Sequence, residues 1–341
     1  MNIGILGVTG YGGAIVYQLM QQHPHVDNIY LYGNPDKPAQ KLSDVVDQFY
    51  LDDTMITPFD VDLVVNEVDC LFSATSSGVA KEMLGSLIDQ KFPIIDLSGD
   101  FRLSDEASYQ KWYKRAHPKL NESLAITYGL AEFTKEYSAY VANPGCYATA
   151  TLLGLAPLAQ ANVLDPNFII VDAKSGVSGA GKSLALSSHF SFIDENLYPY
   201  KLNEHQHIPE MMNQLKQWDE KIPAIQFTTT QVPLNRGLMA TIYVKLNQNM
   251  TQAQIDKLFL NTYHQTPFVH YLNERIPSLK EVVGTNHCAI GAVFNETTQV
   301  LTIVSVIDNL LKGAAGQAVQ NFNQMFGFDE TTALPLFAQL P

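Results

Sequence analysis

Cys146 has the surroundings in this sequence that most suggest covalent chemistry. It follows the turn-forming triplet Asn143-Pro144-Gly145 and precedes the run YATATLLGLAPLA, whose apolar spacing predicts a helix broken near Pro157. A cysteine at a helix start meets free backbone N–H groups and the positive end of the helix dipole, and both lower a thiol pKa. We therefore expect Cys146 to be a nucleophile and not an inert buried thiol.

A thiolate needs a proton partner, and the segment KLNEHQHIPEMMNQL offers His205 and His207. Pro209 fits the first position of a helix, which would put both histidines in the loop before it. Glu210 would then pair with a histidine or simply favour the helix N-terminus. General acid–base use of one histidine is the better interpretation of this pair.

Metal binding by the H-x-H pair is the alternative, but no further Cys/His cluster has ligand spacing. The other two cysteines, Cys70 and Cys288, lead into strand-like segments. Three cysteines without a CxxC spacing argue against a disulfide framework and against a zinc site. We expect no metal.

A glycine turn opens the chain. The segment MNIGILGVTGYGG predicts a buried strand from Ile3 to Leu6, a turn and a helix. Gly7, Gly10 and Gly13 follow G-x-x-G-x-x-G, a variant of the dinucleotide fingerprint, in which glycines admit a pyrophosphate to the backbone at a helix N-terminus. A tight turn without ligand is the alternative. The position between strand and helix favours a dinucleotide, and the turn residues expected to contact it include Thr9, Tyr11 and Gly12.

The next strand, in NIYLYGNPDKP, ends at Gly33-Asn34 without the acidic residue that usually holds an NAD ribose, so NADP(H) is favoured. Strands alternating with helices predict a doubly wound parallel sheet of Rossmann type, with ligands at the carboxyl ends of its strands. The loop after the strand in VDCLFSATSSG would therefore place Ser76 and Gly78 beside the cofactor.

Two further segments offer groups that bind anions. Arg102, in FPIIDLSGDFRL, would face the ligand cleft, unless it forms a surface ion pair with Asp100 or Asp105. The segment FIIVDAKSGVSGAGK ends a strand at Lys174 and continues through Gly179 into a loop that would offer N–H groups and a lysine to an anion. This loop lacks the G-x-x-x-x-G-K-[ST] spacing, which disfavours a kinase or ATPase.

Composition narrows the class of protein. The 341 residues are 46% hydrophobic, enough for two domains, and carry a formal charge of −13. Such a charge disfavours a nucleic-acid partner. The first residues lack the pattern of a signal peptide, and no apolar run is long enough for a bilayer, so we expect a cytoplasmic protein without membrane contact.

Nine motifs in register resemble the family of N-acetyl-γ-glutamyl-phosphate reductases, which is related to aspartate-semialdehyde dehydrogenase. The resemblance covers nearly the whole chain, and the motifs are GVTGYGG, DLSGDFRL, YGLAE, NPGCYATA, DAKSGVSGAGK, HQHIPE, VPLNRG, VVGTNHCAIG and IDNLLKGAAGQAVQNFN. It implies NADPH-dependent reductive dephosphorylation of an acyl phosphate through a cysteine thioester, in arginine biosynthesis.

The resemblance also implies residue roles. Cys146 would be the nucleophile and His207 the acid–base group, with the acyl phosphate and inorganic phosphate as small-molecule partners. The residues implied to shape the site or bind substrate are Arg102, Asn143, His205, Glu210 and Arg236. Lys174, from the loop described above, is expected to bind substrate as well. Asn309 would lie near the nicotinamide. Gly179, in the loop after Lys174, is expected to contact the cofactor.

The implied architecture is a Rossmann-type dinucleotide-binding domain, residues 1–145, completed by residues 313–341, whose helix, roughly 313–326, returns to it. Residues 146–312 would form an α+β catalytic, substrate and dimerisation domain. The long strands in FTTTQVPLNRGLMATIYVKL and VLTIVSVI suit a subunit interface, so a homodimer or homotetramer is expected.

Three other functions stay open. One is a reductase of aspartyl phosphate or of a carrier-bound aminoadipyl phosphate, which only a rate comparison between substrates separates. Another is a cysteine hydrolase built on Cys146 and His207, which would leave the glycine turn unexplained. The third is an inactive NADP-binding regulator, which the presence of both residues disfavours.

Overall fold

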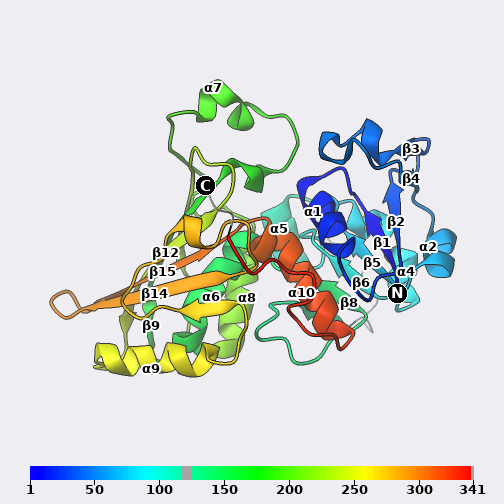
Figure 1. The fold of residues 1–341 in the computed structure, drawn as a ribbon. Helices are drawn as coiled ribbons and strands as arrows, with labels where there is room; N and C mark the ends of the chain where they lie inside the picture. Colours follow the sequence, from blue (N-terminus) through cyan, green and yellow to red (C-terminus); the bar gives the residue numbers. More distant parts are fainter. Residues whose placement is uncertain (117–124, 339–341) are drawn as a thin grey trace. The chain divides into compact units, whose positions relative to one another are not determined.

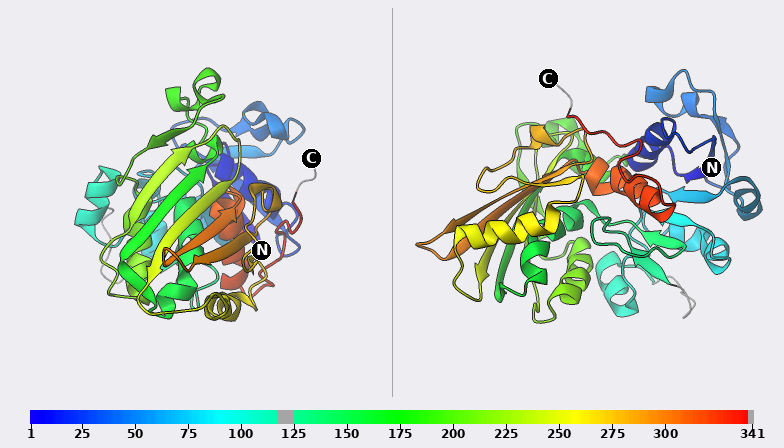
Figure 2. Two further views of the ribbon diagram at one scale, coloured as in Figure 1. Left: turned by 90° about the vertical axis from the view of Figure 1, so that its left-hand side faces the viewer. Right: turned by 60° about the horizontal axis from the view of Figure 1, so that its bottom comes forward.

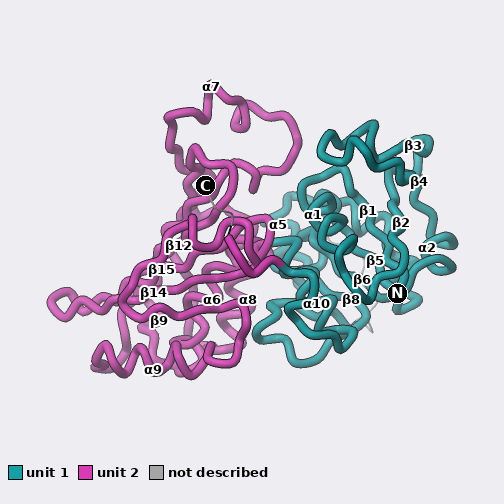
Figure 3. Tube along the Cα trace, in the orientation of Figure 1, with its two compact units in different colours: residues 1–144, 314–334 teal, residues 145–313, 335–341 magenta. Residues whose placement is uncertain are grey.

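The computed structural model describes residues 1–116 and 125–338, which form two compact units (Figure 3). Of the described residues, unit 1 comprises 1–116, 125–144 and 314–334, and unit 2 comprises 145–313 and 335–338. Residues 335–338 belong to unit 2, where the carbonyl of Pro335 accepts a hydrogen bond from the backbone N–H of Asn286.

Unit 1 is built on an eight-stranded sheet in the order β3-β4-β2-β1-β5-β6-β8-β7 (Figure 1). Every pairing is parallel except that of β3 with β4. The predicted doubly wound sheet is confirmed. The strands are β1 (Asn2–Leu6), β2 (Asn28–Gly33), β3 (Gln40–Lys41), β4 (Met55–Pro58), β5 (Cys70–Ser73), β6 (Ile94–Asp96), β7 (Ile126–Tyr128) and β8 (Tyr140–Ala142).

Helices flank this sheet, and the last of them comes from the C-terminal part of the chain. Helix α10 packs against α1 and β6, so the returning helix lies in unit 1. Its apolar and amide side chains are buried together. The helices are α1 (Tyr11–Met20), α2 (Val61–Glu67), α3 (Ala80–Met83), α4 (Gly85–Asp89), α5 (Glu106–Tyr113) and α10 (Gly316–Met325).

Unit 2 is built on a mostly antiparallel sheet in the order β10-β11-β9-β12-β15-β14-β13. Helices α6 and α9 pack on one face of it, α8 packs against α6, and the left view of Figure 2 turns the opposite face toward the reader. The strands are β9 (Leu164–Ser175), β10 (Tyr198–Tyr200), β11 (Gln226–Gln231), β12 (Leu238–Leu246), β13 (Val269–Tyr271), β14 (Cys288–Asn295) and β15 (Val300–Ile307). The helices are α6 (Cys146–Gln160), α7 (Phe190–Ile193), α8 (His207–Trp218) and α9 (Gln252–Tyr263).

Helix α6 is the central helix of unit 2 and is buried along nearly its whole length. It contacts the sheet closely at Gly154, where an added Cβ would lie 2.8 Å from Cδ1 of Ile242. The predicted break near Pro157 is wrong, because the helix continues through this residue to Gln160. Tertiary burial of the helix outweighs the cost of the proline, which is about 3 kcal/mol in a helix interior.

Among the described residues, 1–116 and 125–338, no helix has the length and apolar character needed to cross a bilayer. The same residues hold no group of three or more His, Cys, Asp or Glu side chains arranged to bind a metal ion.

Candidate active site

Cys146 is the first residue of α6, and Gly145 is the N-cap. No side chain of the N-cap closes the helix start, so the first N–H groups of the helix point to the space around the cysteine. Cys146 is half-buried, whereas the free thiols of Cys70 and Cys288 are fully buried. Burial raises the pKa of the Cys70 thiol, which keeps that residue an unreactive part of the core.

Glu210 joins the helix of the cysteine to the helix of the histidine. Its Oε1 accepts a hydrogen bond from the backbone N–H of Gly145 at 2.7 Å, and its side chain is 1% exposed. Helix α8, which carries Glu210, begins at His207. Glu210 therefore fixes the turn before Cys146 against the first turn of α8.

The predicted start of α8 is wrong by two residues. His207 and not Pro209 is its first residue, so this histidine lies on the helix, and Pro209 is its third residue. Proline is tolerated there because the first N–H groups of a helix have no partner within it.

His205 and His207 lie together, with ring centroids 4.6 Å apart. Nδ1 of His205 accepts a hydrogen bond from the backbone N–H of His207 at 3.2 Å, so the neutral ring carries its proton on Nε2. Burial, followed by the nearby His207 and Lys201, lowers the pKa of His205 to about 2. His205 is thus a neutral neighbour of His207.

Tyr147 covers this pair of histidines. Its ring centroid lies 5.0 Å from that of His205 and 6.0 Å from that of His207. Its hydroxyl is 2.8 Å from that of Tyr200, and burial raises the pKa of both phenols, that of Tyr200 to about 12. Two neutral tyrosines therefore restrict how the imidazole rings can turn, and neither tyrosine was predicted as a site residue.

The backbone of Gly313 packs against Cys146. A Cβ added at Gly313 would lie 2.7 Å from Cβ of Cys146, closer than real side chains approach. Gly313 belongs to a single π-helical turn, Leu311–Ala315, of a kind that is frequent at functional sites. Its N–H donates to the backbone carbonyl of Asp308 at 2.9 Å.

Arg236 and Asn309 are anchored beside this turn. A terminal nitrogen of Arg236 lies 3.6 Å from the buried carboxylate of Asp308. The amide of Asn309 accepts from the N–H of Gly237 at 2.8 Å and donates to Ser178 Oγ at 3.0 Å. Asn309 Nδ2 also lies 3.8 Å from the position of a Cβ added at Gly179. Arg236, Gly179 and Asn309 thus lie around the segment that supports Cys146.

Lys174 is not among the residues that gather there. Its Nζ forms an ion pair with Asp172 at 2.5 Å, and both side chains are partly exposed. Strand alternation puts them on the face of β9 opposite to Val171 and Ala173, which are buried toward α6. The expected anion-binding role of Lys174 therefore finds no support in its position.

Asn143 and Arg102 are held in unit 1. Asn143 is fully buried; its Nδ2 donates to the carbonyl of Ala314 at 3.0 Å, and its Oδ1 accepts from Asn321 at 3.0 Å. Arg102 donates from Nε to the carbonyl of Asn143 and from Nη2 to that of Leu97, each at 2.8 Å. The Arg102 guanidinium is therefore oriented by backbone carbonyls. Asp100, one of its two expected ion-pair partners, accepts from the backbone N–H of Gly78.

The glycine turn lies at the carboxyl ends of β1, β2 and β5. Gly7 has φ +94°, and an added Cβ would lie 2.7 Å from the carbonyl of Ala74. At Gly13 an added Cβ would lie 2.3 Å from the carbonyl of Gly7, so the helix can approach the turn only with glycine there. Gly10 and Gly12 meet no such contact.

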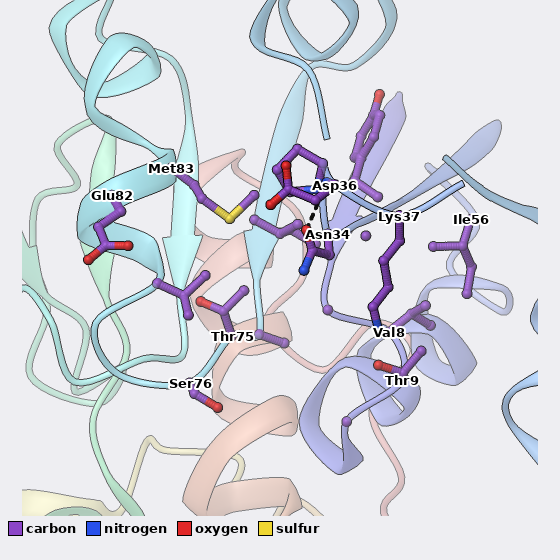
Figure 4. A pocket seen from close by; sticks show the side chains of 18 of the residues that line it. Val8, Thr9, Asn34, Asp36, Lys37, Ile56, Thr75, Ser76, Glu82 and Met83 are labelled. Atoms are coloured by element: carbon purple, nitrogen blue, oxygen red, sulfur yellow. Dashed lines mark hydrogen bonds between the residues drawn. The ribbon is translucent and has the colours of Figure 1, made fainter. Parts of the chain in front are cut away.

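A pocket of about 530 Å³ opens above this turn (Figure 4). Glu82 and Met83 lie on one side of it, and Lys37 and Ile56 on the other. A concave site at the strand ends, closed below by glycines and a helix N-terminus, fits a dinucleotide. The residues that line it are Leu6, Gly7, Val8, Thr9, Gly10, Tyr32, Gly33, Asn34, Pro35, Asp36, Lys37, Gln40, Ile56, Ala74, Thr75, Ser76, Val79, Glu82 and Met83.

Four of the predicted cofactor residues line this pocket, namely Gly7, Thr9, Gly10 and Ser76. The other predicted cofactor residues of unit 1 are close in sequence to residues that line the pocket. Tyr11, Gly12 and Gly13 form the first turn of α1, and Gly78 lies two residues after Ser76.

Asp100 fixes the loop between Ser76 and Val79, two residues that line the pocket. Its carboxylate is fully buried and accepts from the N–H of Gly78 at 2.6 and 2.8 Å and from the hydroxyl of Tyr109 at 2.8 Å. The sequence suggested Asp100 only as a partner of Arg102. A buried acidic residue four positions after Asp96 in DLSGD was the available signal.

Two protein-family models match the chain: "Semialdehyde dehydrogenase, NAD binding domain" over residues 2–139, and "Semialdehyde dehydrogenase, dimerisation domain" over residues 146–309. Among similar curated proteins, "N-acetyl-gamma-glutamyl-phosphate reductase 2" of Lactiplantibacillus plantarum is 49% identical. N-acetyl-gamma-glutamyl-phosphate reductases of Listeria monocytogenes and Limosilactobacillus fermentum are 47% and 44% identical. All three matches cover 100% of both chains.

Solved structures share the fold at low identity. Aspartate semialdehyde dehydrogenase II of Vibrio cholerae, complexed with ASA, has a TM-score of 0.71 at 16% identity, over 96% of this chain and 98% of that one. Aspartate semialdehyde dehydrogenase of Candida albicans, with NADP, has a TM-score of 0.65 at 14% identity, over 96% and 99%.

Proposed function

Because the chain belongs to the N-acetyl-γ-glutamyl-phosphate reductase family, we propose that it reduces N-acetyl-γ-glutamyl phosphate to N-acetylglutamate semialdehyde through a thioester on Cys146. It is an oxidoreductase of the semialdehyde dehydrogenase type that uses NADP(H), and the reaction is a step of arginine biosynthesis. The observation that best supports this mechanism is the hydrogen bond from Gly145 to Glu210, because it connects the turn before Cys146 to the helix that begins at His207.

Cys146 begins the reaction as the nucleophile. Its sulfur attacks the acyl carbon, a C–S bond forms, the bond from carbon to the phosphate oxygen breaks, and inorganic phosphate leaves with the electron pair. Covalent capture divides one difficult displacement and reduction into two easier steps. Backbone N–H groups at the start of α6 stabilise the developing oxyanion, each by roughly 2.7–4 kcal/mol.

His207 acts as the acid–base group, taking the thiol proton and returning a proton at the carbonyl oxygen. Such a group typically contributes about 10²–10⁴-fold. His205 stays neutral and presents its ring to His207, so it positions that residue and does not compete for the proton. NADPH, when bound, would supply the hydride that reduces the acyl group. The C–S bond then breaks, the Cys146 sulfur keeps the electron pair, and the semialdehyde leaves.

The remaining site residues are assigned from the family. Arg102 engages the phosphate of the substrate, and Asn143, Arg236 and Glu210 shape or bind the acyl part. Gly7, Thr9, Gly10 and Ser76 hold the dinucleotide, since they line the unit 1 pocket. Asn309 and Gly179 contact the nicotinamide.

The protein forms a homodimer or homotetramer in this proposal. Support comes from the dimerisation-domain match and from the helix-free face of the unit 2 sheet, which carries the half-exposed Asp172, Lys174 and Tyr243. The three free thiols suit a reducing compartment, so we assign the enzyme to the cytoplasm.

The reverse assay tests the reaction. Purified protein should reduce NADP only when N-acetylglutamate semialdehyde and phosphate are both present, with each component omitted in turn as the control. NADP reduction without phosphate would contradict the acyl-phosphate step. A higher rate with aspartate semialdehyde would indicate that aspartyl phosphate is the substrate. Turnover of a substrate without any nicotinamide cofactor would indicate a hydrolase.

A further inference from the structure

Residues 181–203 form an arm that projects from the unit 2 sheet (Figures 1 and 3). The arm contains a short 3₁₀ turn, Leu186–Ser188, then α7, and returns through β10 to the sheet edge beside β11. Its side chains hold one another: the rings of Phe192 and Tyr198 have centroids 5.1 Å apart, and the Tyr198 hydroxyl donates to the carbonyl of Ser187 at 3.2 Å. The arm is therefore a formed element.

The arm exposes an unusual amount of apolar surface. Leu184 is 102% exposed, Leu186 75%, Phe190 76% and Leu197 64%, and further surface comes from Phe192 and Leu202. A fully exposed aromatic side chain presents about 150–250 Å², so these two phenylalanines and four leucines together expose on the order of several hundred Å². The largest apolar patch of a typical monomer is about 300–600 Å². An area near 800 Å² is what each partner contributes to a standard stable interface.

The charge of the arm suits contact with another copy of the same chain. The protein carries a formal charge of −13, so two copies repel each other at long range. The arm itself is balanced, with Lys182 and Lys201 against Asp194 and Glu195. It also lies inside residues 146–309, the segment that matches a dimerisation domain.

We infer that the arm is a docking surface for a second copy of this chain, and that docking fixes both ends of the arm at the active site. The first end begins just after Ser178, whose hydroxyl accepts from Asn309. The second end carries Tyr200, whose hydroxyl lies 2.8 Å from that of Tyr147, the residue after Cys146. Both contacts exist in the single chain, and docking would hold them in place during turnover, so activity depends on assembly.

The double variant Leu186→Asp/Phe190→Asp tests this inference, with Leu260→Asp as the matched control. Leu260 is 46% exposed on α9, outside the arm. Sedimentation velocity gives the mass of the assembly, and reductase activity per subunit is measured across a 100-fold range of protein concentration. Circular dichroism checks the fold, and the milder Leu184→Ser/Leu197→Ser variant replaces the double variant if that one fails to fold.

We expect the arm variant to form a smaller assembly and to lose at least tenfold in activity at low concentration, with recovery as the concentration rises. Damage to the fold of one subunit would not recover in this way. An assembly of unchanged mass would overturn the inference, and so would an equal change in the Leu260 control. So would a smaller assembly that is fully active at every concentration. The link to activity rests on the proposed function, but the mass measurement does not, so the two can fail separately.

Discussion

Oε1 of Glu210 lies 2.7 Å from the backbone nitrogen of Gly145 and accepts its hydrogen bond. Gly145 precedes Cys146, and Glu210 shares the first turn of α8 with His207. A hydrogen bond to a charged group contributes about 1.5–3 kcal/mol, and its loss leaves a buried group unsatisfied. One buried carboxylate thus sets the distance between the nucleophile and its proton partner.

Glu210→Ala should lower kcat about 10–100-fold, because the cysteine turn loses the carboxylate that accepts the N–H of Gly145 and moves relative to His207. The KM for NADPH should stay unchanged, since the dinucleotide pocket lies in unit 1. Glu210→Gln keeps an acceptor oxygen and should recover most of the rate. Steady-state kinetics of both variants check this, and equal losses in the two would argue against a positioning role.

Gly313→Ala should disable the enzyme without any change to a reactive group. The added methyl would lie 2.7 Å from Cβ of Cys146, so the helix start must shift. Overpacking of this kind costs about 1–3 kcal/mol. We expect a lower kcat and slower labelling of the Cys146 thiol by iodoacetamide. Gly85→Ala, where an added Cβ meets nothing within 4 Å, is the control. A Gly313→Ala enzyme with normal labelling would count against close packing here.

His205 should make the protein acid-sensitive. Burial lowers the pKa of His205 to about 2, below the value of about 6.5 in the unfolded chain. The contribution of this group to stability is therefore complete above pH 6.5 and is lost as the pH falls. The loss is about 1.4 kcal/mol per pH unit, or about 2 kcal/mol at pH 5. Any stability deficit of His205→Asn at pH 7 should shrink by pH 5 in scanning fluorimetry. A deficit that does not depend on pH would show that His205 is not held neutral.

Lys37 should favour NADPH over NADH, because its ammonium group can contact the 2′-phosphate that only NADPH carries. Among the described residues, Lys37 is the cationic side chain that lines the dinucleotide pocket. An ammonium–phosphate contact of about 1.5–3 kcal/mol corresponds to a 10–100-fold rise in KM for NADPH in Lys37→Ala, with little change for NADH. Lys41→Ala is the control, since Lys41 pairs with Asp53 at 2.8 Å. Equal effects of Lys37→Ala on both cofactors would assign the 2′-phosphate to other residues.

The sequence predicted the local features of this site well. A glycine turn between strand and helix and a cysteine after Asn-Pro-Gly are short-range patterns, and their elements formed where expected. The doubly wound sheet followed from alternating strands and helices.

The sequence did not predict the contacts between segments that are far apart in the chain. Glu210 and Gly145 are 65 residues apart, and nothing in either segment reveals that they meet. The approach of Gly313 to Cys146 also depends on tertiary packing. Lys174 was expected near an anion because it ends a predicted strand, but the alternation of side chains along β9 places it on the same face as Asp172. Local chemistry could be predicted, whereas side-chain partners across the fold could not.

Intact-protein and peptide mass spectrometry of the acylated enzyme tests the central claim most directly. Enzyme mixed with N-acetyl-γ-glutamyl phosphate and no NADPH should gain one N-acetylglutamyl group on the peptide that contains Cys146, and NADPH should remove it. The variant Cys146→Ser should carry no such thioester and should lose reductase activity. An adduct on another residue, or a Cys146→Ser enzyme with the full rate, would contradict a thioester at the start of α6.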